Sequence, residues 1–265
     1  MLLMILAVLM FLVAVVFSML GQGGGVLYTP IQVWAGIHFH VAATTSLFLI
    51  MVMSLSASIV FRKANKIDWP LVLVLESNTA LGGFVGGLWS GRFTGGTLSV
   101  MFALLVVIAA YFMIRTFDID RSCEQQRQSP FLWHRQLGDE AYCVNLAIAL
   151  PISFAAGVAS GMVGVGGGIL KVPMMVLLFG IPMDIAVGSS SLMVGITALG
   201  GFAGHVTNGH WDWRTSLVLA AAVFVGGQIG SRISIGLDKK KLKKGFGWFL
   251  LAVAALMFAR LWLGH

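Results

Sequence analysis

The sequence has few charged side chains: Asp, Glu, Lys and Arg make up 10% of its 265 residues, and 58% are hydrophobic. Soluble domains carry about 25% charged residues, so this composition excludes an ordinary soluble enzyme with a single core. Several runs of about 20 apolar residues are long enough to cross the hydrocarbon core of a bilayer as helices. The sequence therefore predicts an all-helical, multi-pass membrane protein.

Cysteine is also scarce, and the familiar catalytic motifs are missing from the sequence. Cys123 and Cys143 have no C-x-x-C spacing, so we expect free thiols with no metal or redox role. There is no Ser–His–Asp pattern, no H-E-x-x-H and no P-loop lysine motif. The net charge of +7 comes from basic residues gathered in a few loops, which indicates membrane topology rather than nucleic-acid binding. The sequence predicts no enzyme activity, no cofactor and no metal site.

Glycine, in contrast, is abundant, and two glycine-rich stretches are copies of each other. Residues 21–30 and 164–173 both read G-x-G-G-G-[VI]-L-x-x-P. Glycine clusters followed by proline interrupt a helix, and interrupted segments at matching positions of two halves are typical of the binding sites of secondary transporters. The repeat continues beyond the glycines in three further pairs: 43–47 with 188–192, 67–69 with 211–213, and 86–92 with 226–232.

Each half contains five apolar segments. In residues 1–116, the first transmembrane repeat, they are 2–20, 26–37, 41–61, 69–91 and 96–115. In residues 143–265, the second repeat, they are 144–163, 169–180, 185–205, 213–235 and 245–263. The polar residues 117–142 between the repeats are predicted to be a cytoplasmic linker, either a loop or a surface helix.

The short segments decide the predicted topology. Residues 26–37 would form a helix of about 18 Å, roughly half the thickness of the hydrocarbon core. The preceding glycines, if extended, add about 16 Å and complete the crossing. With ten crossings, three basic loops share one side, which fits the positive-inside rule. Because five crossings per half is an odd number, the second half enters from the opposite side, and the repeats are inverted. The ten crossings together place both termini on the extracytoplasmic side of the cell (inner) membrane.

Inverted repeats would bring the starts of the two half-length helices together near the midplane. A helix N-terminus carries unpaired N–H donors and a partial positive charge, so two of them can hold an anion. The alternative interpretation is that the glycines only allow close helix packing. The predicted substrate-binding backbone is Gly23, Gly24, Gly25 and Val26 with Gly166, Gly167, Gly168 and Ile169.

Polar side chains near these motifs are further candidates for the site. Hydroxyls at Thr45, Ser46, Ser190 and Ser191 suit the oxygens of an oxyanion, or they bond back to carbonyls of their own helix. Lys171 stands one turn into the second half-length helix, at the position where the first half has Tyr28. Because a lysine at membrane depth is costly, Lys171 is predicted either to pair with the anion or to reach toward water.

Two titratable residues are candidates for proton coupling. Glu76 lies about two turns inside its predicted span, where a carboxylate can carry a proton, or it is a hydrogen-bonded packing residue. His205 falls near the outer face and titrates close to neutral pH, although most exposed histidines have no such role.

The doubled glycine motif, with Thr45-Ser46-Leu47 and Ser190-Ser191-Leu192, resembles the sulfite exporter TauE/SafE family, also called the toluene-sulfonate uptake permease family. The likeness covers nearly the whole chain except the polar linker. It implies transport of small sulfur-containing anions such as sulfite, sulfonates or sulfoacetate. The first half departs from the pattern, with Phe61 near the position of His205.

The sequence thus favours a secondary active transporter of a small organosulfonate or sulfite, with alternating access and an ion gradient, predicted to be of protons. The partners expected are this anion, the lipid bilayer and a proton as co-substrate, and a homo-oligomer is left open. An anion channel, or a transporter of another small carboxylate or oxyanion on the same fold, remains the alternative. A membrane-embedded enzyme ranks last, for want of a catalytic group of residues.

Overall fold

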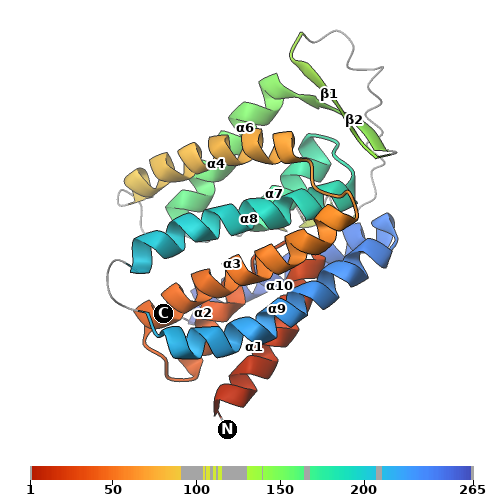
Figure 1. The fold of residues 1–265 in the computed structure, drawn as a ribbon. Coiled ribbons are helices and arrows are strands. Elements are labelled where there is room, and N and C mark those ends of the chain that lie inside the picture. The colour runs from red at the N-terminus through yellow and green to blue at the C-terminus, as the bar shows by residue number, and fades with distance from the viewer. Residues whose placement is uncertain are drawn as a thin grey trace. The chain divides into compact units, whose positions relative to one another are not determined.

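The computed structural model describes residues 2–90, 104, 106–107, 110–111, 113–114, 130–138, 140–163, 168–206 and 211–263. Most of them are helical (Figure 1). The helices of the first half are α1 (Leu2–Met19), α2 (Gly25–Trp34), α3 (Phe39–Lys63) and α4 (Trp69–Ser90). Those of the second half are α6 (Leu146–Val163), α7 (Gly168–Pro173), the π-helical η1 (Met174–Leu178), α8 (Met183–Val206), α9 (Trp213–Gly236) and α10 (Lys239–Leu263).

The helices are long and apolar in the way the sequence predicts. Four of them have the length and hydropathy of membrane spans: Leu2–Met19, His40–Lys63, Met183–Ala203 and Trp213–Gly236. The two half-length segments are confirmed as short helices, α2 and α7 with η1. The predicted segment 96–115 lies mostly outside the described residues. The inverted orientation of the repeats and the ten crossings stay predictions.

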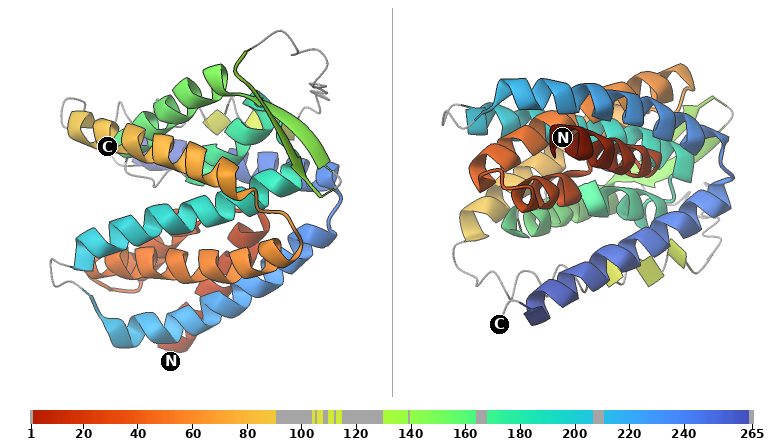
Figure 2. Two further views of the ribbon diagram at one scale, coloured as in Figure 1. Left: turned by 45° about the horizontal axis from the view of Figure 1, so that its top comes forward. Right: turned by 90° about the horizontal axis from the view of Figure 1, so that it is seen from below.

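The described chain forms two compact units, and each takes helices from both halves of the sequence. The first unit, Met1–Ile67 with Val187–Gly236, contains α1, α2, α3, α9 and most of α8. Within it α9 packs against both α1 and α3, and Figure 2 shows the same neighbours from two further sides. Gly226 and Gly230 make this packing close, because a Cβ at either position would overlap backbone atoms of α1.

The second unit, Asp68–Ala186 with Leu237–His265, contains α4, α6, α7, η1 and α10. Here α4 packs closely on α6. A Cβ at Gly82 would overlap the carbonyl of Phe154, and one at Gly157 would overlap the carbonyl of Thr79. Helices α1 and α6 are the first helices of the two halves, and α4 and α9 occupy matching positions in the two repeats. In both units, therefore, the first helix of one half packs against the α4 or α9 helix of the other half.

The matching Asp-Trp pairs of the repeat begin equivalent helices. At the start of α4 the Asp68 carboxylate accepts a hydrogen bond from the Leu71 amide at 3.2 Å. At the start of α9 the Asp212 carboxylate accepts from the amides of Arg214 and Thr215. Aspartate is among the preferred residues at this position, because its oxygen satisfies amides of the first turn. The repeat therefore extends to local structure at these two helix starts.

The polar linker contains strands, so the prediction of a loop or surface helix is wrong for its second part. Strands β1 (Leu132–Leu137) and β2 (Glu140–Asn145) pair antiparallel, with Leu137 opposite Glu140. Gly138 has a φ of 60° at the turn between them, a conformation that glycine adopts without strain. The sequence contains a strand signal in Trp133, Tyr142 and Val144, since aromatic and β-branched side chains favour strands, but the charged residues of the linker obscured it. Strand β2 runs past residue 142, the predicted end of the linker.

The prediction of free thiols is also wrong for Cys143. This residue lies in β2, is buried and is disulfide-bonded. The spacing of the two cysteines in the sequence does not indicate a disulfide, because a disulfide depends on the distance between the cysteines in the fold. Cys123 lies outside the described residues.

Candidate functional site

The first glycine motif forms a tight turn that leads into α2. Gly21 and Gly24 have φ values of 66° and 67°, in the left-handed region where other residues are strained. Gly24 is the N-terminal flanking residue of α2 and offers no side-chain cap to the first turn. The amides of the first turn therefore lack a capping side chain, which is the condition for an anion site at a helix N-terminus.

Apolar side chains pack directly against the other two glycines of the motif. A Cβ at Gly23 would overlap Val194 and Ile50, and one at Gly25 would overlap Ile50. The alternative interpretation, close packing, therefore accounts for these two positions as they stand. An anion that reached the start of α2 would have to displace the Ile50 side chain, which is a movement of one rotatable group rather than of backbone.

The candidate hydroxyls of the first unit bond across helices. The Ser190 hydroxyl donates to the Gly21 carbonyl at 2.9 Å, which ties α8 to the glycine turn. The Ser46 hydroxyl accepts from Gln32 Nε2 at 2.9 Å. The Thr45 and Ser216 hydroxyls lie 3.1 Å apart, in a hydrogen bond. Among the neighbours in sequence, Thr44 bonds back to its own helix, through the carbonyl of His40, and Ser191 is buried in α8.

Tyr28 and Gln32 of α2 form a polar group inside the first unit. Tyr28 is fully buried, and its hydroxyl donates to the sulfur of Met53 at 3.4 Å. Gln32 Nε2 donates to the Tyr28 carbonyl at 3.1 Å, whereas Gln32 Oε1 is buried with no hydrogen-bond partner among the described residues. A buried acceptor left unsatisfied costs free energy and is a reason to look for a ligand or water.

Two further serines on α3 were missed by the sequence reasoning. The hydroxyls of Ser54 and Ser58 are buried and have no partner in the part of the chain that the structure describes. They lie four residues apart and hence on one face of the helix. Their signal in the sequence is weak, because serine in an apolar helix usually bonds to its own backbone.

In the second unit, Lys171 and Glu76 form a buried ion pair. Lys171 Nζ donates to Glu76 Oε2 at 2.7 Å, and the two side chains are 2% and 7% exposed. Lys171 comes from α7 and Glu76 from α4, so two residues predicted separately are brought together by the fold. The pair is internally neutral, which makes two charges tolerable in an apolar helix packing.

The remaining candidates are placed only in part. Gly166 and Gly167 lie outside the described residues. Gly168 and Ile169 begin α7, and Val26 lies in the first turn of α2. His205 lies near the end of α8. The predicted meeting of the two helix starts stays a prediction.

Outside the candidate membrane spans, the Asp68 carboxylate accepts hydrogen bonds from two side chains. Asp68 Oδ1 and Oδ2 accept from Arg135 at 2.6 and 2.9 Å, and Oδ2 also accepts from the Tyr142 hydroxyl at 2.6 Å. Burial alone raises the pKa of Asp68, but the hydrogen bonds from Arg135, Tyr142 and the Leu71 amide outweigh it and lower the pKa below its usual value. This bidentate contact fixes the hairpin to the start of α4.

No group of three or more His, Cys, Asp or Glu side chains that could hold a metal ion occurs among the described residues. The first unit has a helix start without a side-chain cap and hydroxyls that bond across helices, and the second unit has a buried ion pair. Groups of the first kind can bind an anion, and a buried carboxylate can carry a proton.

Comparison with known proteins matches the chain along most of its length. A family model described as Sulfite exporter TauE/SafE matches residues 6–257. A probable membrane transporter protein, YunE, from Bacillus subtilis (strain 168) is 26% identical over 256 residues, covering 90% of this chain and 90% of the relative. A probable membrane transporter protein from Xylella fastidiosa (strain Temecula1) is 26% identical over 255 residues, covering 95% and 93%. A third, from Methanocaldococcus jannaschii, is 23% identical over 259 residues, covering 91% and 90%. No solved structure matches the chain.

Proposed function

The chain belongs to the sulfite exporter TauE/SafE family and is a membrane transporter of that type, and on that premise we propose that it is a secondary active transporter of small sulfur-containing anions. The substrate class is an organosulfonate such as sulfoacetate, or sulfite. The proposal includes the inverted repeats, the ten crossings and the alternating access that the sequence predicts. The observation that carries it, beside the family, is the buried pair of Lys171 and Glu76.

Two kinds of group support anion binding in this proposal. The first turn of α2 has no side-chain cap, so its amides suit the oxygens of a sulfonate or sulfite. Lys171 supplies a buried positive charge, which Glu76 balances in the state described. A tetrahedral or pyramidal oxyanion has several acceptor oxygens and can take the place of the carboxylate on Lys171.

Charge balance then gives a reason for proton coupling. A substrate anion that displaces Glu76 from Lys171 would leave one uncompensated negative charge inside the protein. Protonation of the Glu76 carboxylate removes that charge, and a neutral buried carboxyl costs far less than an ionised one. Because Glu76 can take up one proton, one proton would move with each substrate molecule and compensate one negative charge, and both would leave when Glu76 binds Lys171 again.

The experiment is uptake of sulfoacetate and of sulfite into proteoliposomes, with and without a pH gradient. We expect the Lys171→Met variant to lose at least about tenfold in uptake, because a hydrogen bond to a charged group contributes on the order of 1.5–3 kcal/mol. We expect Glu76→Gln to exchange substrate across the membrane but to lose its dependence on the pH gradient.

Lys244→Met and Glu140→Gln are matched controls, since both residues lie outside the buried pair. Unchanged uptake by Lys171→Met would remove the lysine from the site. Uptake by the unmodified protein that ignores every imposed proton gradient would contradict the coupling. A steady anion current through the unmodified protein would favour a channel instead.

A further inference from the structure

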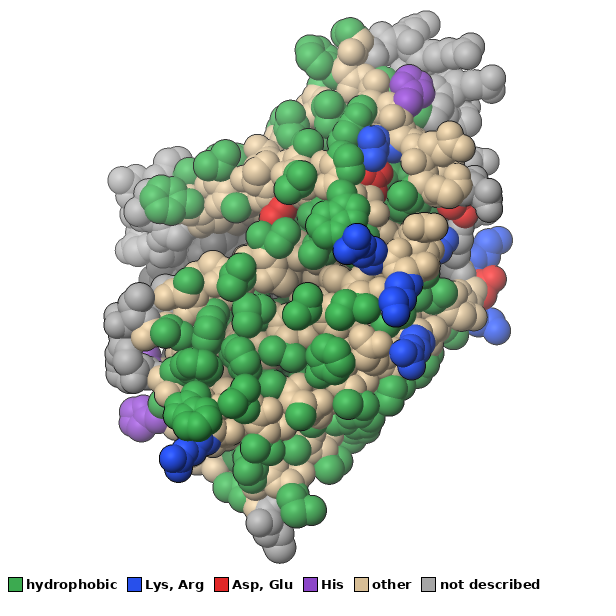
Figure 3. Space-filling view, in the orientation of Figure 1, with side chains coloured by type: hydrophobic (Ala, Val, Ile, Leu, Met, Phe, Trp, Pro, Cys, Tyr) green, Lys and Arg blue, Asp and Glu red, His purple; other side chains and the backbone are tan. Residues whose placement is uncertain are grey.

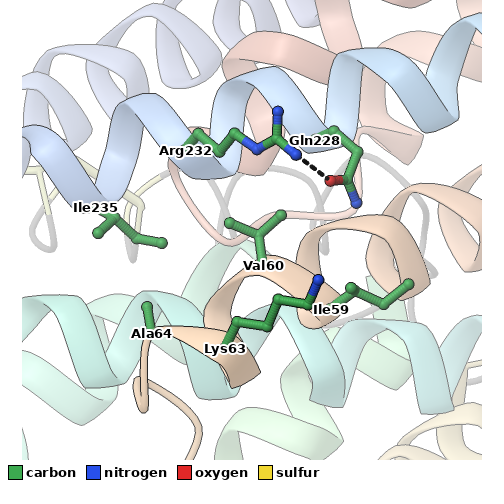
Figure 4. A pocket seen from close by; sticks show the side chains of 7 residues that line it. All are labelled: Ile59, Val60, Lys63, Ala64, Gln228, Arg232 and Ile235. Carbon is green, nitrogen blue, oxygen red and sulfur yellow. Dashed lines mark hydrogen bonds between the residues drawn. The ribbon is translucent and has the colours of Figure 1, made fainter.

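A cavity of about 300 Å³ lies between α3 and α9 in the first unit. Figure 4 shows the side chains that line it, coming from both helices. They include the apolar Ile59, Val60 and Ile235 and the polar Lys63, Gln228 and Arg232. None of these residues takes part in the buried ion pair or the glycine motif, so the transport site does not account for the cavity.

Two cations from different helices reach toward this cavity (Figure 4). Gln228 positions one of them: its Nε2 donates to the Ser56 carbonyl at 2.7 Å, and its Oε1 accepts from Arg232 Nη2 at 3.3 Å. Lys63 comes from the last turn of α3. Neither cation is paired with a carboxylate in the part of the chain that the structure describes. The cavity therefore has an excess of positive charge.

The place of the cavity along the helices indicates the depth of lipid headgroups. The candidate spans His40–Lys63 and Trp213–Gly236 both end beside it. Ile59 and Ile235 at its edge are 38% and 37% exposed. Figure 3 shows the face along α3 and α9 as largely apolar, with Lys and Arg side chains toward the ends of these helices. Hydrocarbon would contact the apolar face, and phosphate groups would lie level with the cations.

We propose that this cavity binds the phosphate headgroup of an anionic phospholipid. Lys63 and Arg232 hold the phosphate oxygens, and Gln228 keeps the guanidinium aimed at them. Ile59 and Ile235 contact the glycerol and the first carbons of the acyl chains. Basic pockets between spans, at the level of the headgroups, recognise anionic lipids in this way. An apolar edge favours a lipid over a free phosphate ion, which would gain nothing from the isoleucines.

The test uses the full chain, purified and placed in nanodiscs of phosphatidylcholine with added phosphatidylglycerol. Bound lipid is counted by native mass spectrometry after release. We expect retained phosphatidylglycerol on the unmodified protein and at least about tenfold weaker retention on the Lys63→Gln/Arg232→Gln double variant, since each interfacial cation contributes about fivefold. The Lys240→Gln/Lys241→Gln variant is the matched control, because it removes two exposed lysines that follow α9 without lining the cavity.

A second variant keeps the charges of Lys63 and Arg232 and fills the cavity with a larger side chain. Ala64 also lines the cavity, so Ala64→Phe should reduce retention of phosphatidylglycerol as the double variant does. Equal losses in the Lys240/Lys241 control would mean that the bilayer surface charge alone attracts the lipid, and would overturn the proposal. Equal retention of phosphatidylcholine, or displacement of the lipid by millimolar inorganic phosphate, would overturn it as well.

Discussion

At the scale of single residues, the most informative feature is the contact between Lys171 and Glu76. A buried charge needs a partner, and the only way to see this partner is through the fold, since 95 positions separate the two residues in the chain. The contact changes the interpretation of both: a lysine predicted to bind the anion and a carboxylate predicted to carry a proton become one exchangeable pair. The choice between anion and carboxylate at Lys171 is then the proposed basis of coupling.

Asp68 gives a residue-scale prediction that depends on pH. Because its pKa is lowered in the folded protein, the stabilisation by Asp68 is fully present above its unfolded pKa of about 3.9 and is lost as pH falls through the lower folded value. We expect Asp68→Asn to lower the free energy of unfolding by about 1.5–3 kcal/mol at neutral pH. The difference from the unmodified protein should shrink below about pH 4.

The measurement is thermal unfolding in detergent from pH 7 down to pH 3. Asp238→Asn serves as the control. Asp238 accepts hydrogen bonds from the amides of Lys240 and Lys241 at the start of α10, and it has no arginine partner within the part of the chain that the structure describes. A difference that stays constant down to pH 3 would contradict the role assigned to the Arg135 contact.

At the scale of elements, glycine decides how closely the helices approach. In the pair of α4 and α6, a Cβ added to Gly82 would meet the backbone of Phe154, whereas one added to Gly83 would have, among the described residues, only the Gly157 carbonyl near it, at 3.7 Å. The two neighbours thus differ in what a side chain would meet, although they are indistinguishable in the sequence. In membranes, where lipid is as apolar as the helix surface, such close approach is a main source of helix association.

The difference between Gly82 and Gly83 predicts different effects on stability when each is replaced by alanine. Gly82→Ala should destabilise the protein by about 1–3 kcal/mol, because the methyl group forces α4 away from α6. Gly83→Ala should be neutral or slightly stabilising, because alanine has the higher helix propensity and meets only ordinary contacts. Thermal unfolding of the two variants under one set of conditions decides the matter, and equal effects would show that the helix contact is not what limits stability.

At the scale of the whole molecule, two indications of membrane orientation disagree. The Asp68–Arg135 contact fixes the hairpin at the start of α4, close in sequence to the basic residues 62–66. By the positive-inside rule those charges predict a cytoplasmic location for this end, whereas the disulfide-bonded state of Cys143 is typical of an oxidising compartment. We expect the charge bias, which sums over three loops, to decide the orientation.

Labelling with a membrane-impermeant maleimide in intact cells tests this in a background of Cys123→Ser and Cys143→Ser. We expect Asn65→Cys, after the end of α3, to be protected until the cells are opened. His38→Cys, before the start of the same helix, should react at once. The reverse pattern would invert the topology and place the hairpin in the oxidising compartment.

The sequence by itself determined the helical membrane architecture, the two glycine-interrupted short helices and the family, because apolar run length and local backbone freedom are properties of adjacent residues. The fold decided what no local pattern encodes: the pairing of Lys171 with Glu76, the cross-helix bonds of Ser190 and Ser46, the contact of Asp68 with Arg135 and the cationic cavity beside Arg232. Each of these joins residues that are distant in the chain. Their energies depend on separation in space, and that quantity exists only once the helices have packed.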